Sequence, residues 1–174
     1  MDHDLVTLMI IKGLVKIQKK HEKMIKFIYT NIRSIKTKFD EFKTLVNTEN
    51  PDIIGLTETW LNCNKNEFES EFNLEGYTML NKDRKNKKGG GVLFYIKDYL
   101  KPTCLDLQGN NDKTETIWAH LRGANNKRIN VGVIYRPPDQ KADVDDIMYN
   151  EINEVVSRNQ NAVIMGDFNL PNIN

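Results

Sequence analysis

The sequence predicts an α/β protein in which helices pack outside a mixed β-sheet, an α/β sandwich. The predicted elements follow the order strand, helix, strand, then several strands joined by hairpins, then helix and strand, which is typical of this class. At 174 residues the chain fits one domain. Its 39% hydrophobic and 28% charged residues are ordinary for a soluble globular protein and do not indicate a disordered chain.

The first half of the domain predicts a strand, a helix and a buried strand. Side chains alternate over Ile25–Thr30 as they do in a strand. Ser34 can cap a helix that runs to Asn47, because apolar residues recur there at helical spacing. Pro51 ends that segment, and the short apolar run Ile53–Thr57 is typical of a buried strand.

The second half predicts mainly strands, with one long helix near its end. The polar segment Asn62–Leu74 indicates a loop or short helix anchored by Phe68 and Phe72, and Asn125-Asn126 fits a hairpin turn. Asp143 can cap a helix through Arg158, whose predicted apolar stripe includes Val156. The expected strands are Tyr77–Leu80, Val92–Ile96, Thr103–Leu107, Glu115–Leu121, Ile129–Tyr135 and Ala162–Met165.

Residues 1–24 are predicted to form an N-terminal amphipathic extension to a domain that spans residues 25–174. Apolar positions over Leu5–Lys23 recur near helical spacing, with lysines toward the end, which favours a basic amphipathic helix. The alternative is an extension that packs loosely on the domain. Asp2, Asp4 and the interruption at Lys12 do not match a secretory signal.

Charge and cysteine content narrow the classes of function. The formal net charge of +1 does not itself favour nucleic acid, although lysine-rich clusters over residues 12–26 and 82–88 can form local patches or simply solvated faces. Cys63 and Cys104 have neither the number nor the spacing of a disulfide framework or a metal site, so a reducing compartment is expected. No stretch approaches the ~20 apolar residues of a membrane span. We therefore expect an intracellular protein, nuclear or cytoplasmic, with no membrane partner.

Polar side chains follow four predicted strands at the point where each strand ends. In sheets covered by helices, functional groups gather at strand ends, because there a rigid backbone meets solvent. The residues are Asn31, Glu58, Tyr135, Arg136, Asp167 and Asn169. Each alone has a structural explanation, such as an Asx turn at Asn31, a solvated carboxylate or helix cap at Glu58, or a surface anchor at Tyr135. Their joint occurrence favours a site.

Five short segments give the sequence a family resemblance. They are Asn31–Ser34, Pro51–Leu61, Gly89–Val92, Ile134–Pro138 and Gly166–Asn169. In this order they resemble the endonuclease/exonuclease/phosphatase superfamily, and in particular the endonuclease domain of jockey- and CR1-like non-LTR retrotransposons, over about Lys26–Asn174. The resemblance implies a four-layer α/β sandwich, a Mg²⁺ or Mn²⁺ cofactor and no other, and DNA bound through its phosphate backbone.

The resemblance also implies roles for individual residues. Glu58 resembles the metal carboxylate, and Asn31 the residue that helps to set the metal site by coordination or hydrogen bonding. Asp167 resembles the group that orients and deprotonates the attacking water. Asn169 resembles an amide donor to the phosphate oxygens, and Tyr135 a phenol near the phosphate.

Weaker expectations concern phosphate contacts outside these positions. Arg136 is expected to add phosphate binding, and Lys87 and Lys88 to touch the DNA backbone. The run Gly89–Gly91 lacks a following Lys-Ser or Lys-Thr, so it is not a nucleotide-binding P-loop, and a tight turn or close strand packing is expected instead.

The sequence departs from the family in lacking its closing Ser-Asp-His-like motif. The histidines are His3, His21 and His120, and none matches that position. We therefore expect the chain to lack the final strands and to be catalytically incomplete. Two alternatives remain: a non-catalytic remnant or interaction module derived from a mobile element, and the same fold acting on a phosphoinositide or sphingomyelin. The Thr57–Trp60 and Tyr135–Pro138 segments favour the retrotransposon branch over the last of these.

Overall fold

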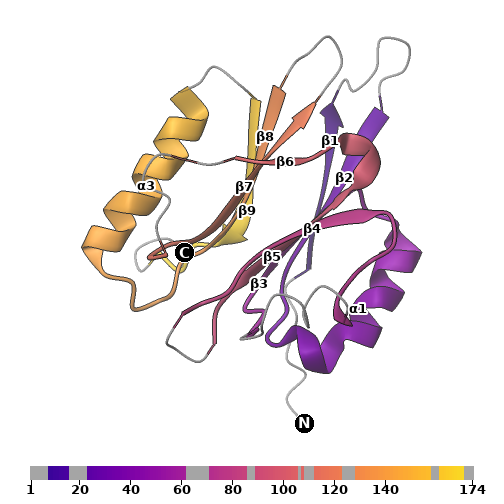
Figure 1. Ribbon diagram of the computed structural model, residues 1–174, viewed down its shortest axis with the longest axis horizontal. Coiled ribbons are helices and arrows are strands. Elements are labelled where there is room, and N and C mark those ends of the chain that lie inside the picture. The colour runs from indigo at the N-terminus through magenta and orange to yellow at the C-terminus, as the bar shows by residue number, and fades with distance from the viewer. Residues whose placement is uncertain are drawn as a thin grey trace.

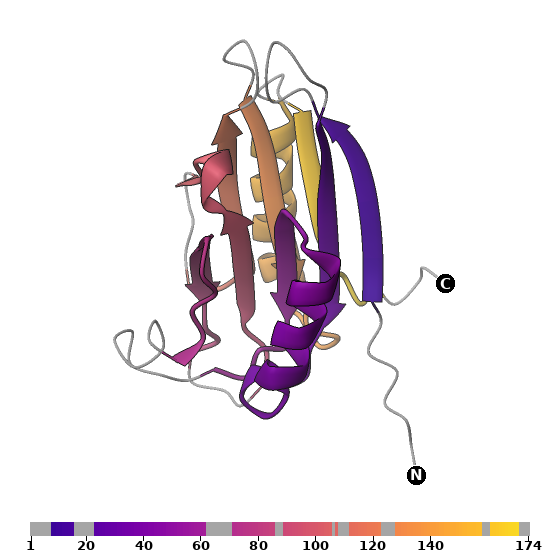
Figure 2. The ribbon, with the colours of Figure 1, turned by 90° about the vertical axis from the view of Figure 1, so that its right-hand side faces the viewer.

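Two mixed sheets pack face to face, and one α-helix lies on the outer face of each (Figures 1 and 2). The computed structural model describes residues 8–15, 23–61, 71–85, 89–105, 107, 112–122, 128–157 and 161–170. The layer order is helix, sheet, sheet, helix. This arrangement confirms the predicted four-layer α/β sandwich.

The first sheet has five strands in the order β1-β2-β3-β5-β4. Its central pair, β2 (Lys23–Asn31) and β3 (Ile53–Thr57), is parallel, and the crossover between them carries a helix as parallel pairs require. The remaining strands pair antiparallel: β1 (Leu8–Val15) with β2, β5 (Val92–Lys97) with β3, and β4 (Tyr77–Lys82) with β5.

The second sheet has four strands in the order β6-β7-β8-β9. β6 (Thr103–Cys104) and β7 (Glu115–Arg122) are antiparallel, as are β7 and β8 (Arg128–Tyr135). β9 (Asn161–Asp167) pairs parallel with β8 after a helical crossover. A short 3-10 turn, η1 (Asp98–Leu100), precedes β6.

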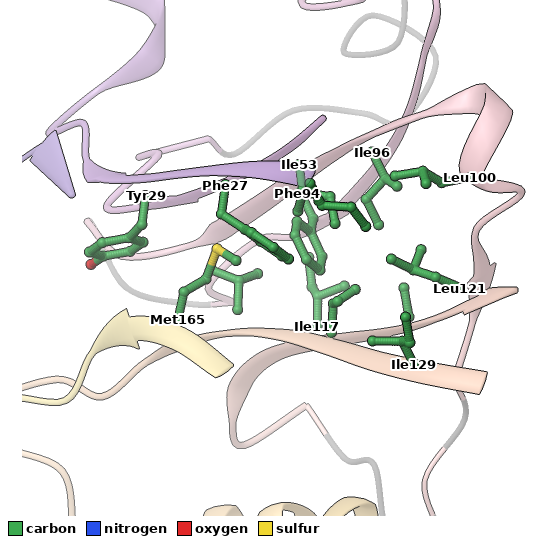
Figure 3. Packing of buried hydrophobic residues seen from close by; sticks show 14 of the residues in the cluster. Phe27, Tyr29, Ile53, Phe94, Ile96, Leu100, Ile117, Leu121, Ile129 and Met165 are labelled. Atoms are coloured by element: carbon green, nitrogen blue, oxygen red, sulfur yellow. The ribbon is translucent and has the colours of Figure 1, made fainter. Parts of the chain in front are cut away.

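The main core lies between the two sheets. Side chains from alternate positions of each strand meet there, for example Phe27 and Phe94 from the first sheet and Ile117 and Met165 from the second (Figure 3). At Gly55 of β3 the sheets come so close that an added Cβ would lie 2.7 Å from Met165 Sδ. This close packing fixes how the ends of the two sheets face each other.

Helix α1 (Ile35–Glu49) covers the first sheet with Ile35, Phe42 and Val46. Ser34 occupies its N-cap position, but its side chain makes no capping hydrogen bond, so the expected cap is wrong. The first turn is instead held by the backbone, because the N–H groups of Ser34 and Ile35 donate to the carbonyls of Glu58 (2.9 Å) and Thr59 (3.1 Å). The helix start therefore fastens the segment that follows β3.

Helix α3 (Ala142–Ser157) covers the second sheet with Met148 and Val155. It begins before Asp143, which lies inside its first turn rather than at the cap, and Val156 is 53% exposed instead of part of the buried stripe. In contrast to Val156, the charged residue Glu151 of the same helix is buried.

Glu151 accepts hydrogen bonds from Thr116 of β7 and from Thr114, which lies just before that strand. The hydroxyls of Thr114 and Thr116 donate to its carboxylate oxygens at 2.9 and 2.6 Å. A buried carboxylate needs such donors, and only the tertiary structure supplies them. The helical pattern alone therefore could not reveal it.

The predicted N-terminal helix is wrong over Leu8–Val15, which form β1 and pair with β2 along eight residues. The physical reason is that β2 has a free edge whose backbone groups need partners, and an apolar run serves a strand as well as a helix. β6 is shorter than expected and ends at Cys104. Phe72 is buried as an anchor, whereas Phe68 and Asn125-Asn126 lie outside the described residues. Among the helices described, none is long and apolar enough to cross a membrane.

Candidate active site

The parallel strand pairs bring the predicted site residues together at their carboxyl ends. In the first sheet Asn31 lies opposite Thr57, so Glu58 follows directly beside it. In the second sheet Tyr135 lies opposite Asp167. Each sheet thus presents two of the predicted residues at the end of a parallel pair.

Hydrogen bonds join the two halves. Asn31 Nδ2 donates to Asp167 Oδ2 at 3.1 Å, and the Tyr135 hydroxyl donates to Glu58 Oε1. Both bonds cross from one sheet to the other. Four of the predicted residues therefore form one cluster, which could not have formed had Glu58 and Asp167 stood at opposite edges.

The Glu58 carboxylate is held by three donors. Tyr135 donates to Oε1. The other oxygen, Oε2, accepts from Trp60 Nε1 and from the Gly90 N–H, and the Gly90 bond measures 3.1 Å. Burial alone would raise the pKa of Glu58, but the hydrogen bonds from Tyr135, Trp60 and Gly90 outweigh it and hold the pKa below its ordinary value. The group is therefore an anion with fixed orientation at neutral pH.

Gly89–Gly91 form a tight turn, as expected from the sequence. This turn lets the Gly90 N–H come close to the Glu58 carboxylate. All three have positive φ, and an added Cβ at Gly91 would lie 2.6 Å from Thr59 Oγ1. The Thr59 and Trp60 N–H groups donate to the carbonyls of Gly91 and Gly90. The glycine turn and the segment after β3 thereby form one rigid frame around the carboxylate.

The oxygen donors of this cluster fit a hard divalent cation. Asn31 Oδ1 is buried and has no hydrogen-bond partner within the described part of the chain, since the amide uses its Nδ2 on Asp167. Mg²⁺ prefers such oxygens, takes one or two carboxylates and keeps other positions for water and phosphate. The described residues contain no group of three or more His, Cys, Asp or Glu that could hold a metal. Glu58 and Asn31 are the residues of this cluster whose oxygens could hold such an ion.

Two tyrosines stay protonated at this site. Burial and the hydrogen bond to Glu58 raise the pKa of Tyr135 far above its ordinary value. Burial also raises the pKa of Tyr29, whose hydroxyl lies 2.8 Å from Thr57 Oγ1 and whose ionisation the charges of Asp167 and Glu58 further oppose. Tyr135 is thus a neutral hydrogen-bond donor across the physiological range, and Tyr29 is a packing residue that the sequence did not single out.

Asn169 is held by Arg136 rather than by the cluster of Asn31, Glu58, Tyr135 and Asp167. Its Nδ2 donates to the Arg136 carbonyl at 3.0 Å, and Arg136 Nη1 donates to the Asn169 carbonyl at 2.8 Å. Arg136 is 5% exposed, and its guanidinium forms a bidentate pair with Asp145 at 2.7 and 2.9 Å. This arrangement does not support the predicted phosphate contact of Arg136. Lys87 and Lys88 lie outside the described residues.

A second ion pair flanks the cluster, and sequence reasoning missed it. Arg84 Nε donates to Glu115 Oε1 at 2.6 Å, and the Gly91 N–H donates to Glu115 Oε2 at 2.5 Å. The guanidinium carbon of Arg84 lies 5.5 Å from the centre of the Tyr135 ring, a cation–π distance. Burial raises the pKa of Glu115, although Gly91 and Arg84 oppose the rise. The only sequence signal was a carboxylate at the start of an apolar strand.

A cavity of about 330 Å³ opens beside this pair. Its lining includes Arg84 and Glu115 together with charged or polar residues near the start of α3, such as Gln140 and Lys141. The lining has as many positively as negatively charged side chains, so the cavity is polar but carries no net charge.

Comparison with known proteins places these observations in a family. The sequence matches the endonuclease/exonuclease/phosphatase family over residues 28–173. A comparison with curated proteins found no match. Among solved structures, the fold is similar to AP endonuclease LMAP from Leishmania major, with TM-score 0.65, 18% identity, and coverage of 88% of this chain and 60% of that one.

Two further structures share the fold. The endonuclease domain of TRAS1, a telomere-specific non-LTR retrotransposon, matches with TM-score 0.60 and 11% identity over 83% of this chain and 59% of that one. The human Nocturnin catalytic domain matches with TM-score 0.57 and 14% identity over 91% and 68%. The chain thus spans about three fifths of the length of the L. major and TRAS1 structures. The family match over most of the sequence, together with the shared four-layer fold, shows that the chain belongs to the endonuclease/exonuclease/phosphatase family.

Proposed function

We propose that this chain is a metal-dependent phosphodiesterase domain that acts on DNA, related to the endonuclease of a non-LTR retrotransposon. The observation that carries the proposal is the convergence of Asn31, Glu58, Tyr135 and Asp167 through hydrogen bonds between the sheets. The Thr57–Trp60 and Tyr135–Pro138 segments support the retrotransposon branch, and the fold is one that the TRAS1 endonuclease domain shares. An intracellular location, nuclear or cytoplasmic, is part of the proposal, because two cysteines without disulfide or metal spacing suit a reducing compartment.

Glu58 and Asn31 would hold a Mg²⁺ or Mn²⁺ ion. Such an ion, when bound, neutralises charge on the phosphate and polarises it toward attack. Glu58 has three of its lone pairs engaged by protein donors, which leaves it suited to a single metal bond. Asn31 would contribute its unpartnered Oδ1.

Asp167 is the group we assign to the attacking water. Asn31 fixes its Oδ2, so the carboxylate has a set orientation and its other oxygen can accept a proton from water. Tyr135 is neutral, and its single hydroxyl hydrogen would turn from Glu58 Oε1 to a phosphate oxygen as charge develops there. Asn169 uses one amide hydrogen on the Arg136 carbonyl and has a second for the phosphate.

We further propose that the chain alone nicks DNA weakly or not at all, because the family's Ser-Asp-His-like motif does not occur in this sequence. One positioned acid–base or electrostatic group typically contributes ~10²–10⁴ in rate. A plasmid nicking assay with Mg²⁺ tests this. Strong nicking that Glu58→Ala or Asp167→Ala abolishes would contradict it. Absence of Mg²⁺ or Mn²⁺ binding at Glu58 would favour the alternative of a non-catalytic remnant or interaction module derived from a mobile element.

Metal binding tests the proposed site directly. Isothermal titration with MnCl₂ should show one binding event for the unmodified chain and none for Glu58→Gln, which keeps the size of the side chain. Glu41→Gln is the matched control, since Glu41 is an exposed carboxylate on α1 away from the cluster. Equal Mn²⁺ affinity in all three proteins would refute the proposed site.

A further inference from the structure

The two tryptophans of the chain have opposite environments. Trp118 is 2% exposed and packs in the core under α3, whereas Trp60 is 46% exposed beside the Glu58 carboxylate. Large aromatic side chains are normally buried, and an exposed one at a functional site is typical of recognition. Apart from the hydrogen bond of its Nε1–H to Glu58, nothing in the proposed chemistry uses the ring.

The exposed indole is held in place. Trp60 Nε1 donates to Glu58 Oε2, and the backbone N–H donates to the Gly90 carbonyl at 2.9 Å. The following residue, Leu61, is 3% exposed and anchors the segment. The ring is therefore presented to solvent by a fixed backbone.

The backbone of Trp60 is also strained. Its φ is 55°, in the left-handed region that bulky residues rarely adopt, and Glu58 has φ 56°. Such strain persists only where surrounding contacts enforce it, and it clusters at ligand-binding positions. The strained turn directs the carboxylate inward while the indole stays at the rim.

The position of the ring limits what it can contact. Its Nε1 touches the carboxylate that would bind the metal, and the metal would bind the scissile phosphate. The indole therefore lies within about one nucleotide of that phosphate. The aromatic group that a DNA strand offers at this distance is a nucleobase, and every base has a face that stacks on an aromatic side chain.

We propose that Trp60 is a nucleobase-stacking residue that takes an unpaired base next to the scissile phosphodiester. The inference rests on the proposed function, because it supposes a DNA substrate. Bases in a continuous duplex are already stacked on each other, so stacking on Trp60 requires a single-stranded, gapped or extruded nucleotide. The chain should therefore bind single-stranded or distorted DNA more tightly than intact duplex.

Fluorescence provides a test on the unmodified chain. Because Trp118 is buried, a change in emission when DNA binds reports mainly on Trp60. Titration with a single-stranded oligonucleotide in Mg²⁺, with its integrity checked on a gel, should quench the emission. Inorganic phosphate should not quench it, and neither should an abasic oligonucleotide of the same length. Trp60→Phe removes the reporter and shows what Trp118 contributes.

Affinity measurements separate stacking from a purely positioning role. By anisotropy of a labelled oligonucleotide, Trp60→Ala should bind roughly 5- to 150-fold more weakly, the range for losing one base–aromatic stack. Trp60→Phe, which keeps a ring but no N–H, should retain most of the affinity. The penalty of Trp60→Ala should disappear on the abasic oligonucleotide. Tyr99→Ala is the control, since Tyr99 is 43% exposed and donates to Asp52, which precedes β3 at the end opposite Glu58.

The outcomes distinguish the inference from the function on which it rests. If Trp60→Phe loses as much affinity as Trp60→Ala, and the loss persists on abasic DNA, the indole only positions Glu58 and the stacking proposal is overturned. An unquenched emission on saturation with oligonucleotide overturns it without any variant. Failure of every oligonucleotide to bind would instead refute the proposed DNA function.

Discussion

The Arg84–Glu115 pair offers the sharpest test of how the site is supported. Side chains of the two residues are 18% and 10% exposed, so the carboxylate is largely removed from water. Removing one partner of a buried pair typically costs 3–5 kcal/mol. Because the Gly91 N–H still donates to Glu115, we expect Arg84→Met to lower the free energy of unfolding by about 3 kcal/mol at pH 7.

The pH dependence of this loss has a definite sign. Burial raises the pKa of Glu115 in the folded chain, and losing Arg84 raises it further because less opposes the burial. The folded chain then binds a proton more readily than the unfolded chain, so protonation favours folding. The penalty of Arg84→Met should therefore shrink as the pH falls from about 7 toward 5.

Urea denaturation followed by circular dichroism at both pH values measures the effect. With a slope of ~1–3 kcal/mol/M, a loss of about 3 kcal/mol lowers the midpoint by about 1 M or more. Lys85→Met is the matched control, because Lys85 pairs with Asp112 through side chains that are 63% and 70% exposed, and its midpoint should not change measurably. A penalty equal at both pH values, or equal in the two variants, would show that Glu115 is not a buried ion held by Arg84.

Three further changes test other parts of the structure. Tyr135→Phe removes a donor that lowers the pKa of Glu58. Ionised Glu58 stabilises the folded chain at pH values above its unfolded pKa, and this stability is lost as the pH falls through the folded pKa. The variant should have less of this stability. ¹³C NMR should show that the Glu58 carboxyl takes up its proton at a higher pH than in the unmodified chain. Gly55→Ala places a methyl 2.7 Å from Met165 Sδ and should cost about 1–3 kcal/mol in urea denaturation, whereas a neutral result would mean that the sheets can separate there. Glu151→Ala leaves two buried threonine hydroxyls without their acceptor, so thermal unfolding should show a loss of about 3 kcal/mol and Glu151→Gln a smaller one; equal losses would show that a neutral acceptor of the same shape cannot replace the carboxylate.

Local pattern was enough to predict most of the fold and the strand ends that carry the site. The largely apolar run Ile53–Thr57 is buried throughout because both its faces are covered, and it forms β3 with the expected bounds. Asn31, Glu58, Tyr135 and Asp167 were recognisable because each interrupts the apolar pattern where its strand stops. Their chemical roles stay predictions.

What the sequence did not reveal depends on contacts between distant residues. The lysine-rich run that contains Arg84 predicts a solvated face, and only the sheet packing shows that this arginine meets Glu115. Glu151 interrupts an apolar helical stripe and is buried because strand β7 supplies hydroxyls to it. Leu8–Val15 fit either helical or extended spacing, and pairing with the edge of β2 decides between them.

The division of the site between two sheets has a consequence for how the protein tolerates mutation. Asn31 and Glu58 travel with one sheet, Tyr135 and Asp167 with the other, and both joining hydrogen bonds run across the gap. A slide of about 1 Å between the layers would break them together, a displacement that can cost ~10²-fold in rate. Substitutions deep in the sandwich, remote from the site, should therefore move Tyr135 and Asp167 away from Glu58 and Asn31 while the chain is still folded. The pKa of Glu58, which the hydrogen bond from Tyr135 lowers, should then rise and report how well the two layers are aligned.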